Sequence, residues 1–152
     1  MKEIIDIYAA KDTVPPSSAF TPTVTSTLTQ YTLSTADTTL RAGYWLYDAS
    51  QNEVRKIKTV KTTTRGVLEE AFSVNLSATT VKVITDQEAK LVKLSVAADN
   101  GGAISINGEA IASGSSINWE TSPADQASGA RFLEPKVVDG ATNSATVSYT
   151  TF

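Results

Sequence analysis

The chain has 152 residues and a formal net charge of −3, and 41% of its residues are hydrophobic, which is enough to form a buried core. It contains neither cysteine nor histidine, which excludes disulfides, thiolate metal sites and every mechanism that needs an imidazole base or a thiol nucleophile. The acidic balance disfavours non-specific binding to nucleic acid, and no stretch approaches the roughly 20 apolar residues of a membrane span, so we expect neither a signal peptide nor a membrane anchor.

Apolar and polar residues alternate with a period of two through most of the chain, which predicts strands rather than helices. The 22 Thr and 16 Ser residues fit the same picture, because β-branched Thr favours strands. Ile5 and Ile7 open a short strand. Pro15, Pro16 and Pro22 then mark a stretch that lacks N–H donors, so we expect an extended arm or a loop there.

Further strands are predicted in the first half, and the last of them lie at residues 67–68, 72–74 and 81–84. Residues 23–33 alternate Thr with apolar residues and predict one half-buried strand, with Val24 and Leu28 on its inner face. Strands over residues 44–47 and 53–60 flank a short polar loop, which predicts an antiparallel hairpin. A β-bulge explains the spacing by three of the apolar residues in the second of these strands: Val54, Ile57 and Val60.

The polar residues 85–88 predict a boundary between two modules. The expected fold is all-β, with two small antiparallel β-sandwich or barrel-like modules. The first, residues 1–86, is a β module that carries the proline-rich arm, and the second, residues 87–152, is a β-sandwich. Modules of this size bury limited apolar surface, so we expect them to pack on one another or on copies of the same chain.

Turn residues recur at short intervals in the second half. Asp99–Gly102 tolerates the positive φ of a tight hairpin, which predicts that residues 90–96 and 103–106 pair with each other. Three more turns are expected from their glycines, at residues 107–108, 113–114 and 139–140. The second half is therefore expected to be a meander.

Carboxylates are the remaining candidates for catalytic acids. The pairs that stand close in the sequence are Glu69 with Glu70, Asp86 with Glu88, and Glu120 with Asp125. Adjacent residues on a strand point to opposite faces, which defeats a shared site for the first pair, and ordinary solvated surface is the stronger interpretation for all three. Calcium-loop, phosphate-loop, dinucleotide and nucleophile-elbow motifs are absent. We therefore assign no catalytic, cofactor-binding or metal-ligating residue and do not expect an enzyme.

A basic cluster stands out in this acidic chain. Contact with DNA or with an acidic partner is one interpretation, and the solvated face and tip of a hairpin is the other. Alternation places neighbouring residues of the cluster on opposite faces of a strand, which argues against a single patch. The five residues are Arg55, Lys56, Lys58, Lys61 and Arg65.

The aromatic strand allows two interpretations. Tyr44, Trp45 and Tyr47, with the distant Trp119, have the ring faces that suit a sugar-stacking platform. Core packing is the alternative, because a small module has few other large side chains to fill it. We predict that Trp45 or Tyr47 is core, and that Leu46 and Tyr44 face a neighbour or solvent.

Two stretches resemble small virion structural proteins of tailed bacteriophages. In the first half the similar segments are Leu40–Tyr47, Asn52–Ile57 and Leu68–Phe72. The second half looks like the small β-sandwich appended to several such proteins, at Lys93–Val96, Ile104–Gly108, Ser113–Gly114 and Ile117–Trp119. The resemblance implies a non-enzymatic virion subunit, with the neck or head-to-tail connector as its place.

We accordingly expect a homo-oligomeric ring or layer at the head-to-tail interface, assembled in the host cytoplasm. The alternatives are a capsid decoration or head-fibre subunit, and a glycan- or receptor-binding β module. The expected partners are copies of the chain and other virion proteins of the portal, tail or capsid. Neither a membrane, a nucleic acid nor a cofactor is expected as a partner.

The proline-rich stretch is the expected docking element. Prolines stiffen residues 11–23 in advance, which lowers the entropy cost of docking onto a neighbouring subunit or another virion protein. A surface loop folded back on its own domain is the alternative. The predicted partner-binding residues are Val14, Pro15, Pro16, Phe20 and Pro22.

Overall fold

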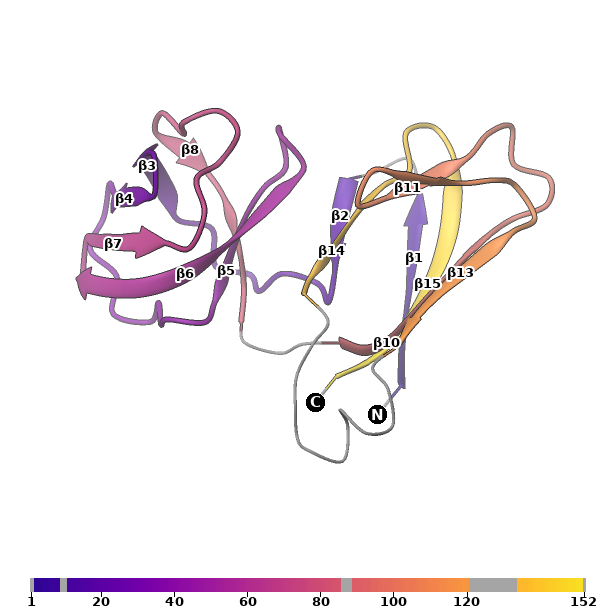
Figure 1. The fold of residues 1–152 in the computed structure, drawn as a ribbon, viewed down its shortest axis with the longest axis horizontal. Coiled ribbons are helices and arrows are strands. Elements are labelled where there is room, and N and C mark those ends of the chain that lie inside the picture. Colours follow the sequence, from indigo (N-terminus) through magenta and orange to yellow (C-terminus); the bar gives the residue numbers. More distant parts are fainter. Residues whose placement is uncertain (1, 9–10, 86–88, 121–133, 152) are drawn as a thin grey trace. The chain divides into compact units, whose positions relative to one another are not determined.

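The computed structural model describes residues 2–8, 11–85, 89–120 and 134–151 (Figure 1). These ranges contain strands and turns but no helix, and the paired strands are antiparallel. The predicted all-β fold is therefore confirmed. No helix in the described ranges is long and apolar enough to cross a membrane.

The chain divides into two compact units, one of which is inserted into the other. Residues 17–86 form the barrel unit, and residues 1–16 together with 87–152 form the sandwich unit. The prediction that residues 1–86 make one module therefore does not hold for residues 1–16. The physical reason is long-range pairing, because the first strand pairs with the last strand of the chain, with Lys2 opposite Thr150.

The sandwich unit has two four-stranded sheets, with orders β1-β15-β10-β13 and β12-β11-β14-β2. Apolar residues from both sheets meet in one core, which includes Val14, Leu94, Ile106, Val138 and Val147, each fully buried. Alternation within the strands supplies these inward residues. The strands are β1 (Lys2–Tyr8), β2 (Lys11–Val14), β10 (Ala89–Val96), β11 (Ile104–Ile106), β12 (Glu109–Ile111), β13 (Ser116–Glu120), β14 (Lys136–Asp139) and β15 (Ser144–Thr151).

The turn at Asp99–Gly102 connects the two sheets and is not a hairpin. β10 pairs with β13 and β15, whereas β11 pairs with β12 and β14. The predicted pairing of residues 90–96 with 103–106 is therefore wrong. Leu94 and Ile104 instead pack in the core between the sheets. The turn at residues 107–108 does form a hairpin, with positive φ at both positions, as its Asn-Gly sequence predicts.

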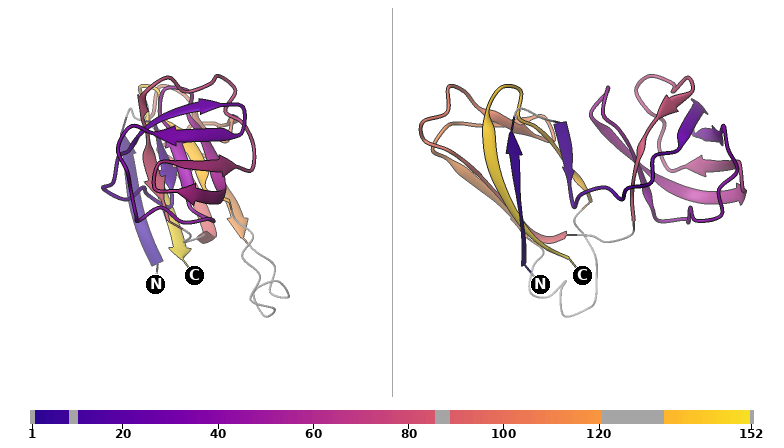
Figure 2. Two further views of the ribbon diagram at one scale, coloured as in Figure 1. Left: turned by 90° about the vertical axis from the view of Figure 1, so that its left-hand side faces the viewer. Right: turned by 180° about the vertical axis from the view of Figure 1, so that it is seen from behind.

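The barrel unit is a single seven-stranded sheet of order β8-β3-β4-β7-β6-β5-β9. The two outermost strands are separated in the chain by Val81 alone, so both ends of the sheet belong to one extended segment. The sheet therefore curls into a nearly closed barrel (Figure 2). Its strands are β3 (Thr23–Thr27), β4 (Gln30–Leu33), β5 (Trp45–Asp48), β6 (Glu53–Thr62), β7 (Arg65–Leu68), β8 (Thr79–Thr80) and β9 (Lys82–Ile84).

Two β-bulges bend the long strand β6 around the barrel. Its register against β7 shifts between Ile57 and Thr59 and again between Val60 and Thr62. The extra residues are therefore Lys58 and Lys61. The predicted bulge is confirmed, and so is the predicted hairpin of β5 and β6, in which Asp48 pairs with Glu53. Bulges increase local twist, which a small closed sheet requires.

Residues 23–33 form two strands rather than one. β3 and β4 pair as a hairpin with Thr27 opposite Gln30, so Leu28 and Thr29 form a two-residue turn. The prediction that Leu28 faces inward is therefore wrong, because this side chain is 69% exposed. Val24 is buried in the barrel core, as predicted.

Candidate interaction surface

The beginning of the predicted docking arm belongs to the sandwich unit. β2 pairs with β14, with Lys11 opposite Asp139 and Val14 opposite Lys136. Val14 is fully buried in the sandwich core, and Pro15 is also buried. The expectation that residues 11–14 lie outside any sheet of their own chain is therefore wrong. The prolines end the strand but do not prevent the four preceding residues from pairing.

The rest of the arm lies beside β8 and β9, the two outermost strands of the barrel sheet. The Ser18 N–H donates to the Val83 carbonyl at 2.7 Å, and the Val81 N–H donates to the Pro22 carbonyl at 3.0 Å. Pro22 is buried there, whereas Pro16 is exposed and Phe20 is 36% exposed. Val14, Pro15 and Pro22 are thus enclosed by their own chain. Pro16 and Phe20 are the predicted contact residues that remain available to a partner.

The aromatic strand is buried on both faces. Trp45 is 7% exposed and Tyr47 is fully buried, which confirms the prediction that they are core residues. Leu46 is also fully buried, in the barrel core, so the prediction that it faces a neighbour or solvent is wrong. Tyr44 is half-buried against the same core. The side chain of Trp119 lies outside the described residues, so these rings form no exposed stacking platform in the described part of the chain.

The five basic residues do not form one patch. Arg55 pairs with Glu53 at 3.1 Å and donates from Nε to the Ala71 carbonyl at 2.7 Å. The Lys56 ammonium lies 5.6 Å from the centre of the Trp45 ring. These two cations are held within the barrel unit. The remaining three are exposed: Lys58, Lys61 and Arg65.

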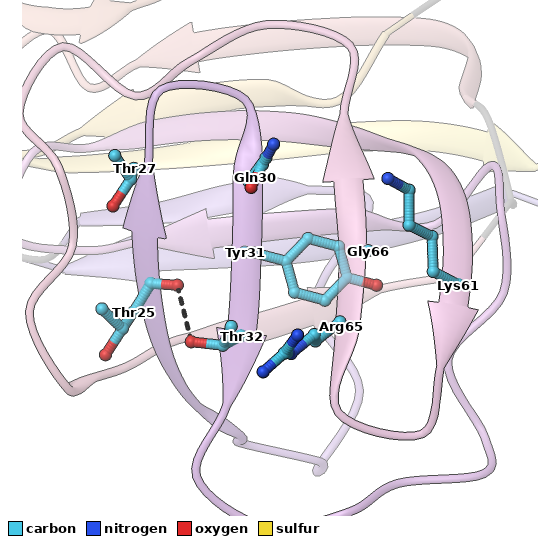
Figure 3. A pocket seen from close by; sticks show the side chains of 8 residues that line it. All are labelled: Thr25, Thr27, Gln30, Tyr31, Thr32, Lys61, Arg65 and Gly66. Atoms are coloured by element: carbon cyan, nitrogen blue, oxygen red, sulfur yellow. Dashed lines mark hydrogen bonds between the residues drawn. The ribbon is translucent and has the colours of Figure 1, made fainter.

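Two of these exposed cations border a shallow hollow of about 260 Å³ between β3, β4, β7 and the end of β6 (Figure 3). The Tyr31 ring points across Gly66, whose missing side chain leaves the room that the ring occupies. Burial raises the pKa of Tyr31, and the Asp37 carboxylate raises it further, so the phenol stays neutral. The residues lining the hollow are Thr25, Thr27, Gln30, Tyr31, Thr32, Lys61, Arg65 and Gly66.

Two carboxylates of the barrel unit, Asp48 and Glu53, hold loops in place by accepting hydrogen bonds. The buried Asp48 accepts from the Ser50 hydroxyl at 2.9 Å and from the Gln51 amide at 2.8 Å. Glu53 accepts from the Ser73 N–H at 3.0 Å. No three His, Cys, Asp or Glu residues among the described residues gather where they could hold a metal ion.

The candidate carboxylate pairs form no site in the described residues. Glu69 and Glu70 are both exposed, immediately after β7. Asp86, Glu88 and Asp125 lie outside the described residues, and so does the side chain of Glu120. The three candidate pairs therefore stay without structural support, and ordinary solvated surface stays the stronger interpretation.

Two exposed aliphatic side chains mark one end of the barrel, which we call the loop end: Leu28, 69% exposed, and Val74, 66% exposed. The Leu28 N–H donates to Asn75 Oδ1 at 3.0 Å, which ties the β3–β4 turn to the loop that carries Val74. The Gln51 side chain bonds both the N–H and the carbonyl of Val74, at 2.8 and 3.0 Å. Hydrogen bonds thus fix three loops around an exposed apolar pair.

The loop end is not predicted from the sequence. The alternation of residues 23–33 continues through Leu28 without Gly or Asn at the turn, so no turn signal was present. Leu28 adopts φ of 53°, a region that L-residues with bulky side chains rarely occupy. Ser73 and Asn75 around Val74 were the available signal for a loop there. No family model, curated protein or solved structure matches the chain.

Proposed function

We propose that the chain is a non-enzymatic structural subunit of a bacteriophage virion that assembles with copies of itself into a ring or layer at the head-to-tail interface. The resemblance of residues 40–72 and 93–119 to tailed-phage virion proteins supports the virion context. The all-β fold is compatible with it. The observation that carries the assembly argument is the loop end, with its exposed Leu28 and Val74.

Leu28 occupies its turn at an energetic cost. A bulky L-residue at positive φ loses about 1 kcal/mol or more relative to glycine, and exposure of its side chain to water brings no burial energy in return. The Leu28 side chain gains burial energy only when another molecule covers it. Leu28 is therefore the residue that we expect at the centre of a contact.

The loops of the loop end are also held in place before any partner binds. Asn75 and Gln51 hold the loops of Leu28 and Val74 by hydrogen bonds between residues far apart in the sequence. A contact surface that is ordered before binding loses little conformational entropy when it binds. Two aliphatic residues on such a surface suit an apolar, self-associating contact better than recognition of a polar ligand.

The test is Leu28→Gly in the full chain, with Ala78→Gly as its matched control. Ala78 is exposed and has φ of 46°, so glycine relieves the same kind of strain there without removing a large apolar side chain. Both variants should raise the free energy of unfolding by about 1 kcal/mol. Only Leu28→Gly should weaken self-association in sedimentation experiments and reduce incorporation into particles.

Wild-type association in Leu28→Gly would contradict the role of the loop end. A wild-type chain that stays monomeric at high concentration and does not enter particles would overturn the proposed function as a whole. Imaging of labelled particles then places the subunit. One ring per particle supports the connector, whereas a scattered lattice of copies supports a capsid decoration instead.

A further inference from the structure

The sandwich unit presents four strand edges, and they differ in how well they are protected. β2 has four residues and is followed at once by Pro15 and Pro16. β12 has three residues and lies between the turns at Gly108 and Gly114. β13 has five residues. β1, with seven residues, is the longest edge of the two described sheets.

β1 lacks three of the features that prevent an edge from pairing with another chain, because it is not short and carries neither a proline nor a bulge. Its seven residues pair with β15 in continuous register, from Lys2 opposite Thr150 to Tyr8 opposite Ser144, with no bulge. The segment contains neither Pro nor Gly. Ile4, the third residue of the strand, is 65% exposed. A long, regular edge with an exposed aliphatic residue is a template for an added strand.

We propose that β1 of one copy pairs antiparallel with β1 of a second copy across a two-fold axis at Ile4. The two sheets then join into one eight-stranded sheet, with β1 next to β1 at its centre. This inference rests on the proposed self-assembly and specifies one contact that builds it. A two-fold contact is isologous, so each favourable pair of residues occurs twice.

The sequence of β1 favours this register over its neighbours. Pairing centred on Ile4 places Ile4 opposite itself and Lys2 opposite Asp6 of the other copy, and opposite charges directly across a strand pair are stabilising. Pairing centred on Glu3 or on Asp6 places identical carboxylates opposite one another. Pairing centred on Ile5 places Ile4 opposite Asp6 and forms no charge pair.

Hydrogen bonding excludes the registers in which the two-fold axis lies between two residues. Alternate residues of β1 direct their N–H and C=O groups toward β15, and the others direct them away. Identical strands can bond only where outward-directed residues face each other, so the register must be centred on a residue. The pairing at Ile4 satisfies this condition.

A charge-swap series in the full chain tests the register. Asp6→Lys places two lysines opposite each other at two symmetric positions and should weaken dimerisation at least about tenfold, as should Lys2→Asp. The double variant K2D/D6K restores the opposite charges and should regain wild-type affinity. Asp99→Lys makes the same charge change at an exposed position of the sandwich unit and is the matched control, with no expected effect.

A cysteine series tests the same contact covalently, since the chain has no cysteine of its own. Residues directly opposite in an antiparallel pair have Cα atoms about 4.5–5.5 Å apart, which suits a disulfide. Under a mild oxidant, Ile4→Cys should therefore form a disulfide-linked dimer. Lys2→Cys and Asp6→Cys should cross-link when mixed but not alone, because equal positions are then about 13 Å apart. The exposed Thr63→Cys is the control.

The outcomes separate this inference from the proposed function. Self-association that resists Asp6→Lys, together with no cross-link in Ile4→Cys, overturns the β1 contact and leaves assembly through the loop end standing. Loss of association in both single variants without recovery in K2D/D6K overturns the register. A strand of another protein captured at β1 while the chain itself stays monomeric overturns the choice of a second copy.

Discussion

The two units differ in the free strand edges that their sheets leave. In the barrel unit the first and last strands of the sheet, β8 and β9, are joined through Val81, so the sheet nearly closes on itself. In the sandwich unit two open sheets pack face to face and leave four edge strands. Both units use the same alternating strands. The barrel sheet has two register shifts in its long strand β6, whereas the sandwich sheets have one, near the start of β10, and bulges add bend and twist to a sheet.

The units also differ in charge. Residues 17–86 contain seven Lys and Arg against six Asp and Glu, a net charge of +1, whereas the sandwich unit contains six against ten, a net charge of −4. The acidic balance of the chain therefore belongs to the sandwich unit. In the barrel unit Asp48 and Glu53 accept hydrogen bonds from loop residues. Lys61 and Arg65 are exposed at the hollow.

The largest predicted effect is the loss of stability when a core leucine is truncated. It tests whether the two units are stable independently. Leu46 and Leu94 are both fully buried, the first in the barrel core and the second in the sandwich core. Truncation of either to alanine should cost about 3 kcal/mol. Hydrogen exchange should show faster opening only in the unit that carries the variant. Equal loss of protection in both units would show that they unfold as one.

A smaller effect is expected for Gly66→Ala in the barrel unit. A Cβ at this position would lie 2.4 Å from the Tyr31 hydroxyl and 2.5 Å from the Thr59 carbonyl oxygen, and the latter is backbone that cannot turn aside. We expect a loss of about 2 kcal/mol in urea unfolding. Gly101→Ala in the sandwich unit, where a Cβ meets nothing within 4 Å, should change little. Equal stability of the two variants would contradict the packing of Tyr31 on Gly66.

The smallest expected effect is a pH dependence in the barrel unit. Burial alone would raise the pKa of Asp37, but hydrogen bonds from Thr39 and Leu40, with Arg41 nearby, lower it overall. The folded state thus holds its proton less tightly than the unfolded state. The stability from this carboxylate is complete above its ordinary pKa of about 3.9 and is lost as the pH falls through the lowered value.

Asp37→Asn removes this dependence. The variant should be less stable than the wild type at pH 7, by less than about 1 kcal/mol because the carboxylate is only partly buried, and the difference should shrink toward pH 2. Urea midpoints at a series of pH values measure it. A difference that stays constant from pH 7 to pH 2 would show that ionisation of Asp37 does not stabilise the barrel.

Local patterns predicted those parts of the fold that depend on local chemistry. The β5–β6 hairpin and the Asn107–Gly108 turn follow from alternation and turn residues, and both are present. The pairing of β1 with β15 links residues at opposite ends of the chain, and no short pattern specifies such a partner. The loop end was missed because Leu28 occupies a turn position that favours glycine.

The insertion of the barrel unit has a consequence for the order of events during synthesis. β1 and β2 leave the ribosome before the barrel unit, whereas their partners β15 and β14 follow it. After residue 86 has been made, roughly 3–13 s of elongation pass before β15 is complete. The barrel unit holds all of its strands from the start of that interval, whereas β1 waits unpaired.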